Sequence, residues 1–176
     1  MRKLTRDKPA IFYPKLVDLL SDCGVSFVLL PHLQSSGIHG AVKWVNKEKV
    51  ILAMSDRRKT VDSFWFSFFH EIQHVLQQKI KQIIITNDKE QCVAALDEKL
   101  EEEDDEFAKN VLIPEERYSE FLAGGHINRE RIVEFANTLE IDPSILLGRL
   151  QKEKKISYRF FNNLKKPFTS IPILFE

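Results

Sequence analysis

The sequence predicts an α+β domain in which a small, mostly antiparallel sheet near the N-terminus packs against several helices. Three observations favour this class. Short apolar runs separated by turn residues fill much of the first third of the chain, and apolar residues recur at helical spacing in most of the rest. The length of 176 residues, with 43% hydrophobic and 30% charged residues, suits one globular domain that spans residues 1–176.

The first elements are one helix and three strands. Residues 9–22 have the apolar spacing of an amphipathic helix, and Gly24 stands where such a helix ends. Residues 25–30 form a short apolar run. Residues 40–45 and 50–54 are two further strand candidates, joined by a polar turn. Together these runs predict the sheet.

Helices dominate the chain from residue 62 onward. One long helix is expected at residues 63–78. Residues 83–85 read as a further short strand or a buried loop. The remaining helices are expected at residues 97–112, 114–122, 128–139 and 143–152.

Charge and cysteine content exclude several classes. Twenty-six basic residues balance 26 acidic ones, whereas a non-specific nucleic-acid binder usually carries a basic excess. Residues 129–152 have a faint helix-turn-helix pattern without a glycine in the turn, so direct DNA binding is not expected. Cys23 and Cys92 are too few for a disulfide framework or a four-cysteine zinc module. No signal peptide or membrane span is visible, and we expect a cytoplasmic protein.

A zinc-site pattern lies in the long helix. His70-Glu71-Ile72-Gln73-His74 is an H-E-x-x-H sequence, and residues four apart share one face of a helix. Both imidazoles can therefore bind one zinc ion. Glu71 stands about 100° round the helix, where it can act as general base towards a metal-bound water. A chance match, with two histidines bonded to backbone carbonyls, is the competing interpretation.

The residues around this pattern support a buried site. The helix is apolar almost all round, which is typical of burial. Its polar exceptions recur at spacings of four and three and form one stripe, made of Ser63, Ser67, His70, His74 and Gln77. A buried polar stripe must face polar partners, a cavity or an ion.

A third ligand is expected from the acidic run of the next helix. Glu103 lies three residues after Leu100 and four before Phe107, which places it on the predicted inward face. Glu103 is therefore the first choice, and Asp104 is the second. The remaining acids of the run flank that face or point outward, and the whole run is otherwise a solvated charged surface. Cys92 is most simply a small buried hydrophobe, but its thiolate would suit zinc and would then hold the site inactive.

Several segments resemble the ImmA/IrrE family of metallo-endopeptidases, and especially the domains found at the C-terminus of HigA-like antitoxins and related transcriptional regulators. The similarity covers about residues 10–167 and is carried by Arg58 to Glu71, by Glu103-Asp104-Asp105-Glu106-Phe107-Ala108 with Leu112-Ile113-Pro114, and by Ile141 to Gln151, which includes Gly148-Arg149-Leu150-Gln151.

This resemblance implies a zincin-like fold, zinc held by His70, His74 and Glu103, and Glu71 as the base. It also implies a protein partner, a helix-turn-helix repressor or antitoxin that is cleaved or regulated in toxin–antitoxin, transcriptional or stress control. Few residues precede the similar region, so a DNA-binding partner is expected on a separate chain. Three positions depart from the family pattern, which commonly has glycine at Gln73, alanine at Asp104 and glycine at Ser144. The bulk of Gln73 is expected to crowd the substrate cleft.

Two functions follow from these observations. The first is a zinc endopeptidase, with His126, Tyr118 and Arg149 as candidate oxyanion stabilisers on residue type alone. The second is a non-proteolytic sensor or antitoxin-like module that binds a partner protein and retains the metal site.

Overall fold

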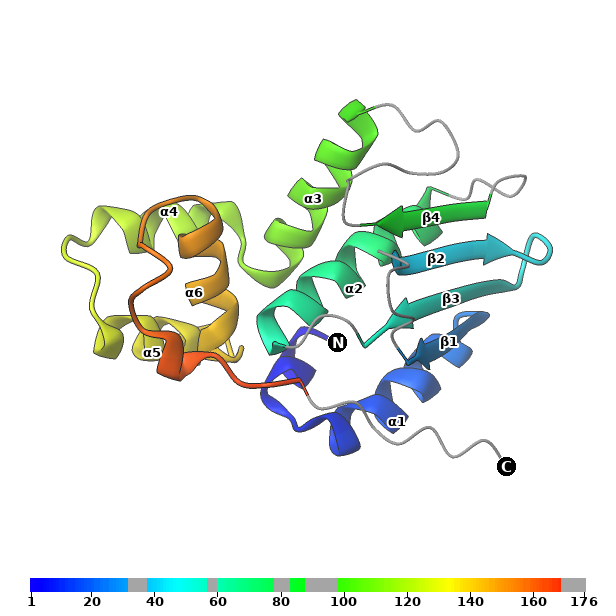
Figure 1. The fold of residues 1–176 in the computed structure, drawn as a ribbon, viewed down its shortest axis with the longest axis horizontal. Helices are drawn as coiled ribbons and strands as arrows, with labels where there is room; N and C mark the ends of the chain where they lie inside the picture. Colours follow the sequence, from blue (N-terminus) through cyan, green and yellow to red (C-terminus); the bar gives the residue numbers. More distant parts are fainter. Residues whose placement is uncertain (32–37, 57–59, 78–82, 88–97, 169–176) are drawn as a thin grey trace.

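The computed structural model describes residues 1–31, 38–56, 60–77, 83–87 and 98–168. Figure 1 shows a four-stranded sheet, two helices against it, and a group of helices at the opposite end of the molecule. In chain order the elements are a 3₁₀ helix (Arg2–Arg6), α1 (Pro9–Ser21), β1 (Val25–Leu30), β2 (Ile38–Trp44), β3 (Val50–Ser55), α2 (Val61–Leu76), β4 (Ile83–Asn87), α3 (Glu98–Leu112), α4 (Glu115–Ala123), α5 (Arg129–Thr138), α6 (Pro143–Lys152) and a second 3₁₀ helix (Asn162–Leu164).

The sheet is mostly antiparallel, as predicted. Its strand order is β1-β3-β2-β4. β2 pairs antiparallel with both β3 and β4, whereas β1 pairs parallel with β3. The apolar run at residues 83–85 is a strand, and β4 lies at the edge of the sheet beside β2. The α+β class is therefore confirmed.

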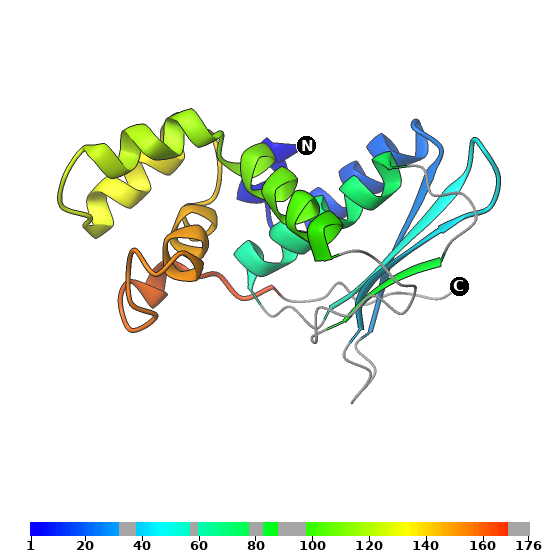
Figure 2. The same ribbon diagram turned by 90° about the horizontal axis from the view of Figure 1, so that it is seen from above.

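One face of the sheet is buried because apolar residues alternate along its strands. In β1 the side chains of Val25, Phe27 and Leu29 are buried, and those between them are more exposed. β3 repeats this alternation. α1 and α2 lie along the buried face (Figure 2). Gly24 ends the turn after α1 at φ +76°, where a Cβ would lie 2.2 Å from the carbonyl oxygen of Glu48, so only glycine fits.

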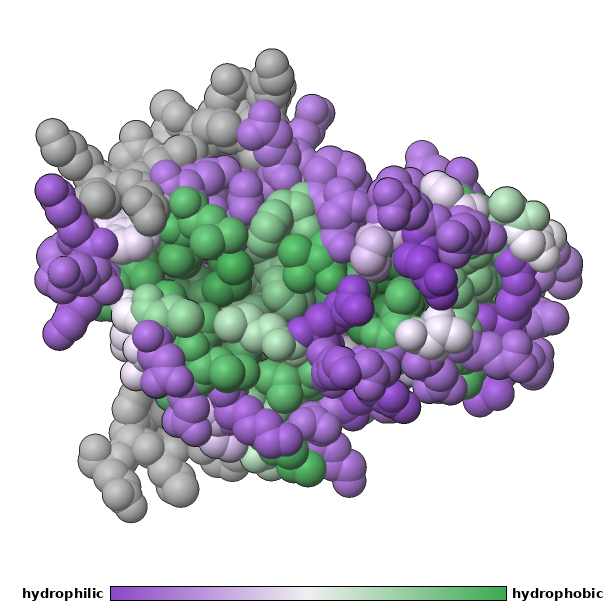
Figure 3. Space-filling model, turned by 180° about the vertical axis from the view of Figure 1, so that it is seen from behind, coloured by the Kyte–Doolittle hydropathy of each residue, from purple (hydrophilic) through white to green (hydrophobic). Residues whose placement is uncertain are grey.

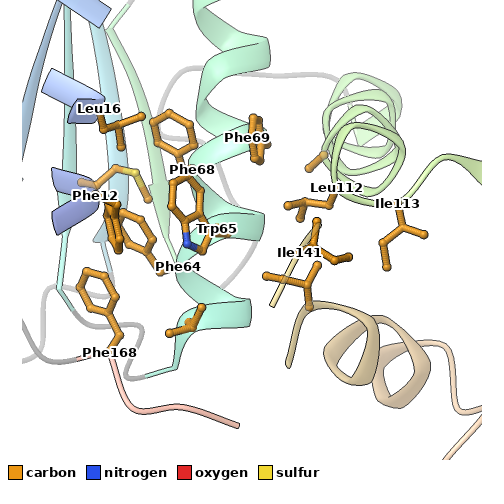
Figure 4. Packing of buried hydrophobic residues seen from close by; sticks show 14 of the residues in the cluster. Phe12, Leu16, Phe64, Trp65, Phe68, Phe69, Leu112, Ile113, Ile141 and Phe168 are labelled. Atoms are coloured by element: carbon orange, nitrogen blue, oxygen red, sulfur yellow. The ribbon is translucent and has the colours of Figure 1, made fainter. Parts of the chain in front are cut away.

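α2 occupies the centre of the core. Phe64, Trp65 and Phe68 are fully buried. The ring of Phe12 in α1 lies 4.9 Å from that of Trp65, and Phe168 near the C-terminus stacks on Phe64 at 4.3 Å (Figure 4). The almost wholly apolar sequence of α2 is explained by this position, with neighbours on nearly every side.

The other half of the molecule is helical and more polar. Asn128 and Asp142 cap α5 and α6 by accepting hydrogen bonds from the backbone N–H groups of Arg131 and Ser144. Figure 3 shows hydrophobic residues gathered on the half that holds the sheet, whereas hydrophilic residues cover most of the half that holds α4 and α5. Among the described residues, no helix combines the length and hydropathy needed to cross a bilayer.

Candidate metal centre

The two histidines of α2 lie side by side against α3. His70 and His74 are four residues apart on one helical face, and their ring centroids are separated by 4.9 Å. Both are buried, with exposed fractions of 7% and 0%. Two imidazoles inside a core require polar partners, and α3 packs along this side of α2.

Three carboxylates of α3 meet these imidazoles. Asp105 Oδ1 lies 3.0 Å from Nδ1 of His70, and Asp104 Oδ2 lies 3.0 Å from Nδ1 of His74. Glu101 lies opposite the other ring nitrogens, 3.4 Å from Nε2 of His70 and 3.8 Å from Nε2 of His74. Each Nδ1 therefore lies near its own aspartate, with hydrogen-bond geometry for His70 and Asp105 but not for His74 and Asp104, and the two Nε2 atoms face one glutamate.

The predicted inward orientation of Glu103 is wrong. Glu103 is exposed, whereas Asp104 and Ala108 are fully buried. The prediction took its helical phase from Leu100 and Phe107, but Phe107 is only half-buried. Successive helical residues are about 100° apart, so an error of one position turns a side chain from the interior to solvent. Asp104, the second choice, does reach the site.

The donor atoms fit a small divalent cation. His70 Nε2, both ring nitrogens of His74, Glu101 Oε1 and Asp104 Oδ2 are buried without a hydrogen bond. Two ligands about 2.0–2.1 Å from a tetrahedral zinc ion lie roughly 3.3–3.4 Å apart, close to the separations found around Glu101. Among the described residues, the side chains of His70, His74, Glu101 and Asp104 place one possible ligand atom each within 4.8 Å of the others.

The carboxylates around His70 also favour a positive charge on its imidazole. Burial opposes protonation of His70, but Asp105 and Glu101, with the further charge of Glu71, outweigh burial and raise its pKa to about 10. The contact with His70 lowers the pKa of Glu101. Burial alone would raise the pKa of Asp105, but the same histidine lowers it. An environment that retains a proton on a buried imidazole also attracts a metal ion, which competes for the same nitrogen.

Glu71 lies against the backbone of β2. Its exposed fraction is 1%, and a Cβ built on Gly40 would lie 2.1 Å from Oε1 of Glu71 and 2.3 Å from its carboxyl carbon. Only a residue without a side chain allows this approach. Gly40 is a site residue that the sequence reasoning missed, although a glycine inside a strand pattern signals such a close contact.

The other predicted site residues lie elsewhere. The guanidinium of Arg149 lies 3.8 Å from the ring centroid of Tyr118, and it donates a hydrogen bond to the carbonyl of Ile113. Both side chains are thus used in packing α4 against α6. His126 is exposed in the connection between α4 and α5. Cys92 lies outside the described residues.

A family profile matches the chain. The profile of the IrrE N-terminal-like domain, a peptidase family, matches residues 32–151, about two thirds of the chain. The matched region includes β2, α2 and α3, and therefore every residue of the site. No curated protein matches the chain.

Proposed function

The chain belongs to the family of IrrE N-terminal-like peptidase domains, and on that premise we propose that it is a zinc-dependent endopeptidase that cleaves or regulates a helix-turn-helix repressor or antitoxin-type protein. The family itself suggests a metallopeptidase with a protein substrate. The fold is consistent with the zincin-like domain of that family. The identity of the metal as zinc, the catalytic step and the class of substrate are what we propose beyond the family.

The proposed zinc ligands are Nε2 of His70, Nε2 of His74 and the carboxylate of Glu101, which replaces Glu103. The supporting observation is that both Nε2 atoms face Glu101 while both Nδ1 atoms are 3.0 Å from an aspartate. Histidines that bind a metal through one nitrogen usually bond a carboxylate or carbonyl through the other. Asp105, which is hydrogen-bonded to Nδ1 of His70, would therefore orient that ring, and we propose the same role for Asp104 beside Nδ1 of His74. Gln77 donates to Asp104 Oδ1 at 2.5 Å and holds that aspartate in place.

Glu71 is the proposed general base. When bound, zinc supplies Lewis-acid activation of the attacking water and of the peptide carbonyl. Glu71 accepts the proton of the water during its attack on the carbonyl carbon and returns it to the leaving amine. Because Gly40 has no side chain, the carboxylate of Glu71 can lie against the strand backbone.

The proposed partner follows from the family resemblance. A repressor or antitoxin with a helix-turn-helix domain would place the protein in toxin–antitoxin, transcriptional or stress control, in the cytoplasm and as one domain over residues 1–176. The balance of 26 basic and 26 acidic residues agrees with a protein partner rather than with direct DNA binding.

A non-proteolytic sensor or antitoxin-like module is the second candidate, and Asp104 favours it. The fully buried carboxylate of Asp104 stands where the family commonly has alanine, and it adds a fourth donor near the two histidines. Four protein ligands close a zinc site, whereas a catalytic zinc keeps one position open.

Replacement of Glu71 separates the two candidates. New N-termini in the proteome would be compared between cells that express the wild type and cells that express Glu71→Gln. We expect a regulator with a helix-turn-helix domain to be cut only with the wild type, while both proteins retain zinc. The sensor reading would prevail if the two proteins had the same biological effect and produced no difference in cleavage.

Gly40→Ala tests how the base is held. The added methyl group would displace the carboxylate of Glu71. We expect the rate of cleavage to fall by about tenfold or more, because small displacements of a catalytic group are costly. Zinc content should not change. Ala53→Ser, on the neighbouring strand, serves as a control for the general tolerance of the sheet to one added atom.

A further inference from the structure

A second concave site lies next to the metal centre on the same pair of helices. Its volume is about 330 Å³, within the range of pockets that hold small organic ligands. The walls come from the first turns of α2, the end of α3, α6, and the segment between residues 158 and 165. Phe66 lies four residues before His70, and Lys109 lies four residues after Asp105. The cavity therefore begins one helical turn from the metal residues on both helices.

Gly148 and Arg149, the first two residues of the segment Gly148-Arg149-Leu150-Gln151, help to build this cavity. A Cβ on Gly148 would lie 2.6 Å from Oδ2 of Asp62, so glycine allows α6 to approach the start of α2. Arg149 is held by the carbonyl of Ile113 and by Glu153, each at 2.9 Å. The metal chemistry uses neither residue, yet both line the cavity.

The lining has an excess of positive charge. Four cationic side chains, Lys109, Arg149, Lys152 and Lys165, face two carboxylates, those of Asp62 and Glu153, which leaves an excess of two. Most of these charges are paired: Lys165 with Asp62 at 3.0 Å, Arg149 with Glu153 and with Glu115, and Lys109 with Glu106 at 2.5 Å. Glu106 and Glu115 do not line the cavity.

Lys152 is the exception. Its ammonium group lies 5.7 Å from the ring centroid of Phe66 and has no carboxylate within ion-pair distance among the residues that the structure describes. Lys109 follows Asp105 by one turn of α3, and Lys152 lies against Phe66, one turn before His70, so both lysines line the side of the cavity nearest the metal centre. An anion there would meet the unpaired ammonium group of Lys152 and the ammonium group of Lys109, which is already paired with Glu106.

The remaining lining suits an organic stem. Phe66, Leu112 and Ile145 contribute apolar surface, and apolar atoms make up most of the cavity wall. Oδ1 of Asp62, in the first turn of α2, is buried without a hydrogen-bond partner in the same cavity. Phosphate or another small inorganic anion would leave this apolar surface uncovered.

We propose that this cavity binds a carboxylate carried on an apolar stem, with the carboxylate at Lys109 and Lys152 and the stem against Phe66, Leu112 and Ile145. The ligand is either a free organic acid or the acidic side chain of a bound protein, since both present this chemistry. The proposal does not depend on proteolysis, because no zinc ligand and no base takes part in it.

The test is a calorimetric titration of the purified full chain with 4-phenylbutyrate, and with 4-phenylbutyramide as the neutral counterpart. We expect saturable binding of the acid and binding of the amide at least about tenfold weaker, because hydrogen bonds to charged groups add that much. Lys152→Gln should weaken binding of the acid by about tenfold. Lys155→Gln, an exposed lysine near the end of the same helix that does not line the cavity, should leave it unchanged.

Three results would overturn the proposal: no saturable binding, equal binding of acid and amide, or equal effects of the two lysine substitutions. Binding that is lost in Glu101→Gln but retained in Lys152→Gln would place the acid at the metal centre and would also refute it. Competition by N-acetylglutamate N-methylamide would identify an acidic side chain as the source of the carboxylate. Absence of competition, with 4-phenylbutyrate still bound, would identify a free acid.

Discussion

The two ends of the interface between α2 and α3 differ in charge and in how that charge is used. At one end His70 and His74 meet three carboxylates, and the Nε2 atoms remain without hydrogen bonds. At the other end four cationic side chains and two carboxylates line a cavity, and three of the cations are already in ion pairs. The same apolar packing supports both ends. A few polar residues on the facing sides, one turn apart, thus give one end donor atoms suited to a metal ion and the other end ammonium groups suited to an anion.

The largest expected effect is at the metal centre, where the substitutions Glu101→Gln and Glu103→Gln are compared. Glu101→Gln should lower zinc affinity by about a hundredfold or more, because a charged ligand is lost. Glu103→Gln should change it little, since that side chain is exposed. Zinc competition titrations measure both. Equal losses, or a greater loss with Glu103→Gln, would restore the ligand set that the sequence predicted.

Asp105 should have a smaller effect through His70. Asp105→Asn should weaken zinc binding by about ten- to a hundredfold, because the ring loses the carboxylate at Nδ1 that orients it. Glu106→Gln, on the exposed side of the same helix, is the control. Unchanged affinity in Asp105→Asn would mean that the ring of His70 is oriented by packing alone.

The pH dependence of zinc binding should follow from the raised pKa of His70. Metal-free His70 holds its proton up to a pH of about 10 instead of the usual 6.5, so zinc must displace that proton at neutral pH. Apparent affinity should therefore rise with pH, by up to about tenfold per pH unit between pH 7 and 9. Proton release measured in two buffers of different ionisation enthalpy checks this. A flat profile above pH 7 would contradict a proton held on His70.

The smallest effect is expected at the cavity, where Gly148 meets Asp62. Gly148→Ala should lower the free energy of unfolding by about 1 kcal/mol, because overpacking against Asp62 outweighs the better helix propensity of alanine. Zinc affinity should not change. In an Asp62→Ala background the same substitution should cost less, which a double-mutant cycle from denaturant unfolding would reveal. A coupling energy of zero would remove Asp62 from the explanation.

Much of the fold followed from local sequence. The helix at residues 9–22, the three N-terminal strands and the H-E-x-x-H helix were predicted within about two residues of their observed ends. Apolar periodicity and end signals such as Gly24 act within one element, so they can be read without knowing the neighbours. The parallel pairing of β1 with β3 depends on a longer connection and was not predicted.

The sequence by itself determined that two histidines share a helical face with a glutamate beside them, because a four-residue spacing has only one geometry on a helix. Only the tertiary structure decided which carboxylate joins them. The acidic run of α3 offers a carboxylate in almost every direction, and the rotation of α3 against α2 selects Asp104 and Glu101 and turns Glu103 to solvent. The contacts of Gly40 with Glu71 and of Gly148 with Asp62 likewise join distant segments. Such contacts depend on how elements pack, and no local pattern specifies that packing.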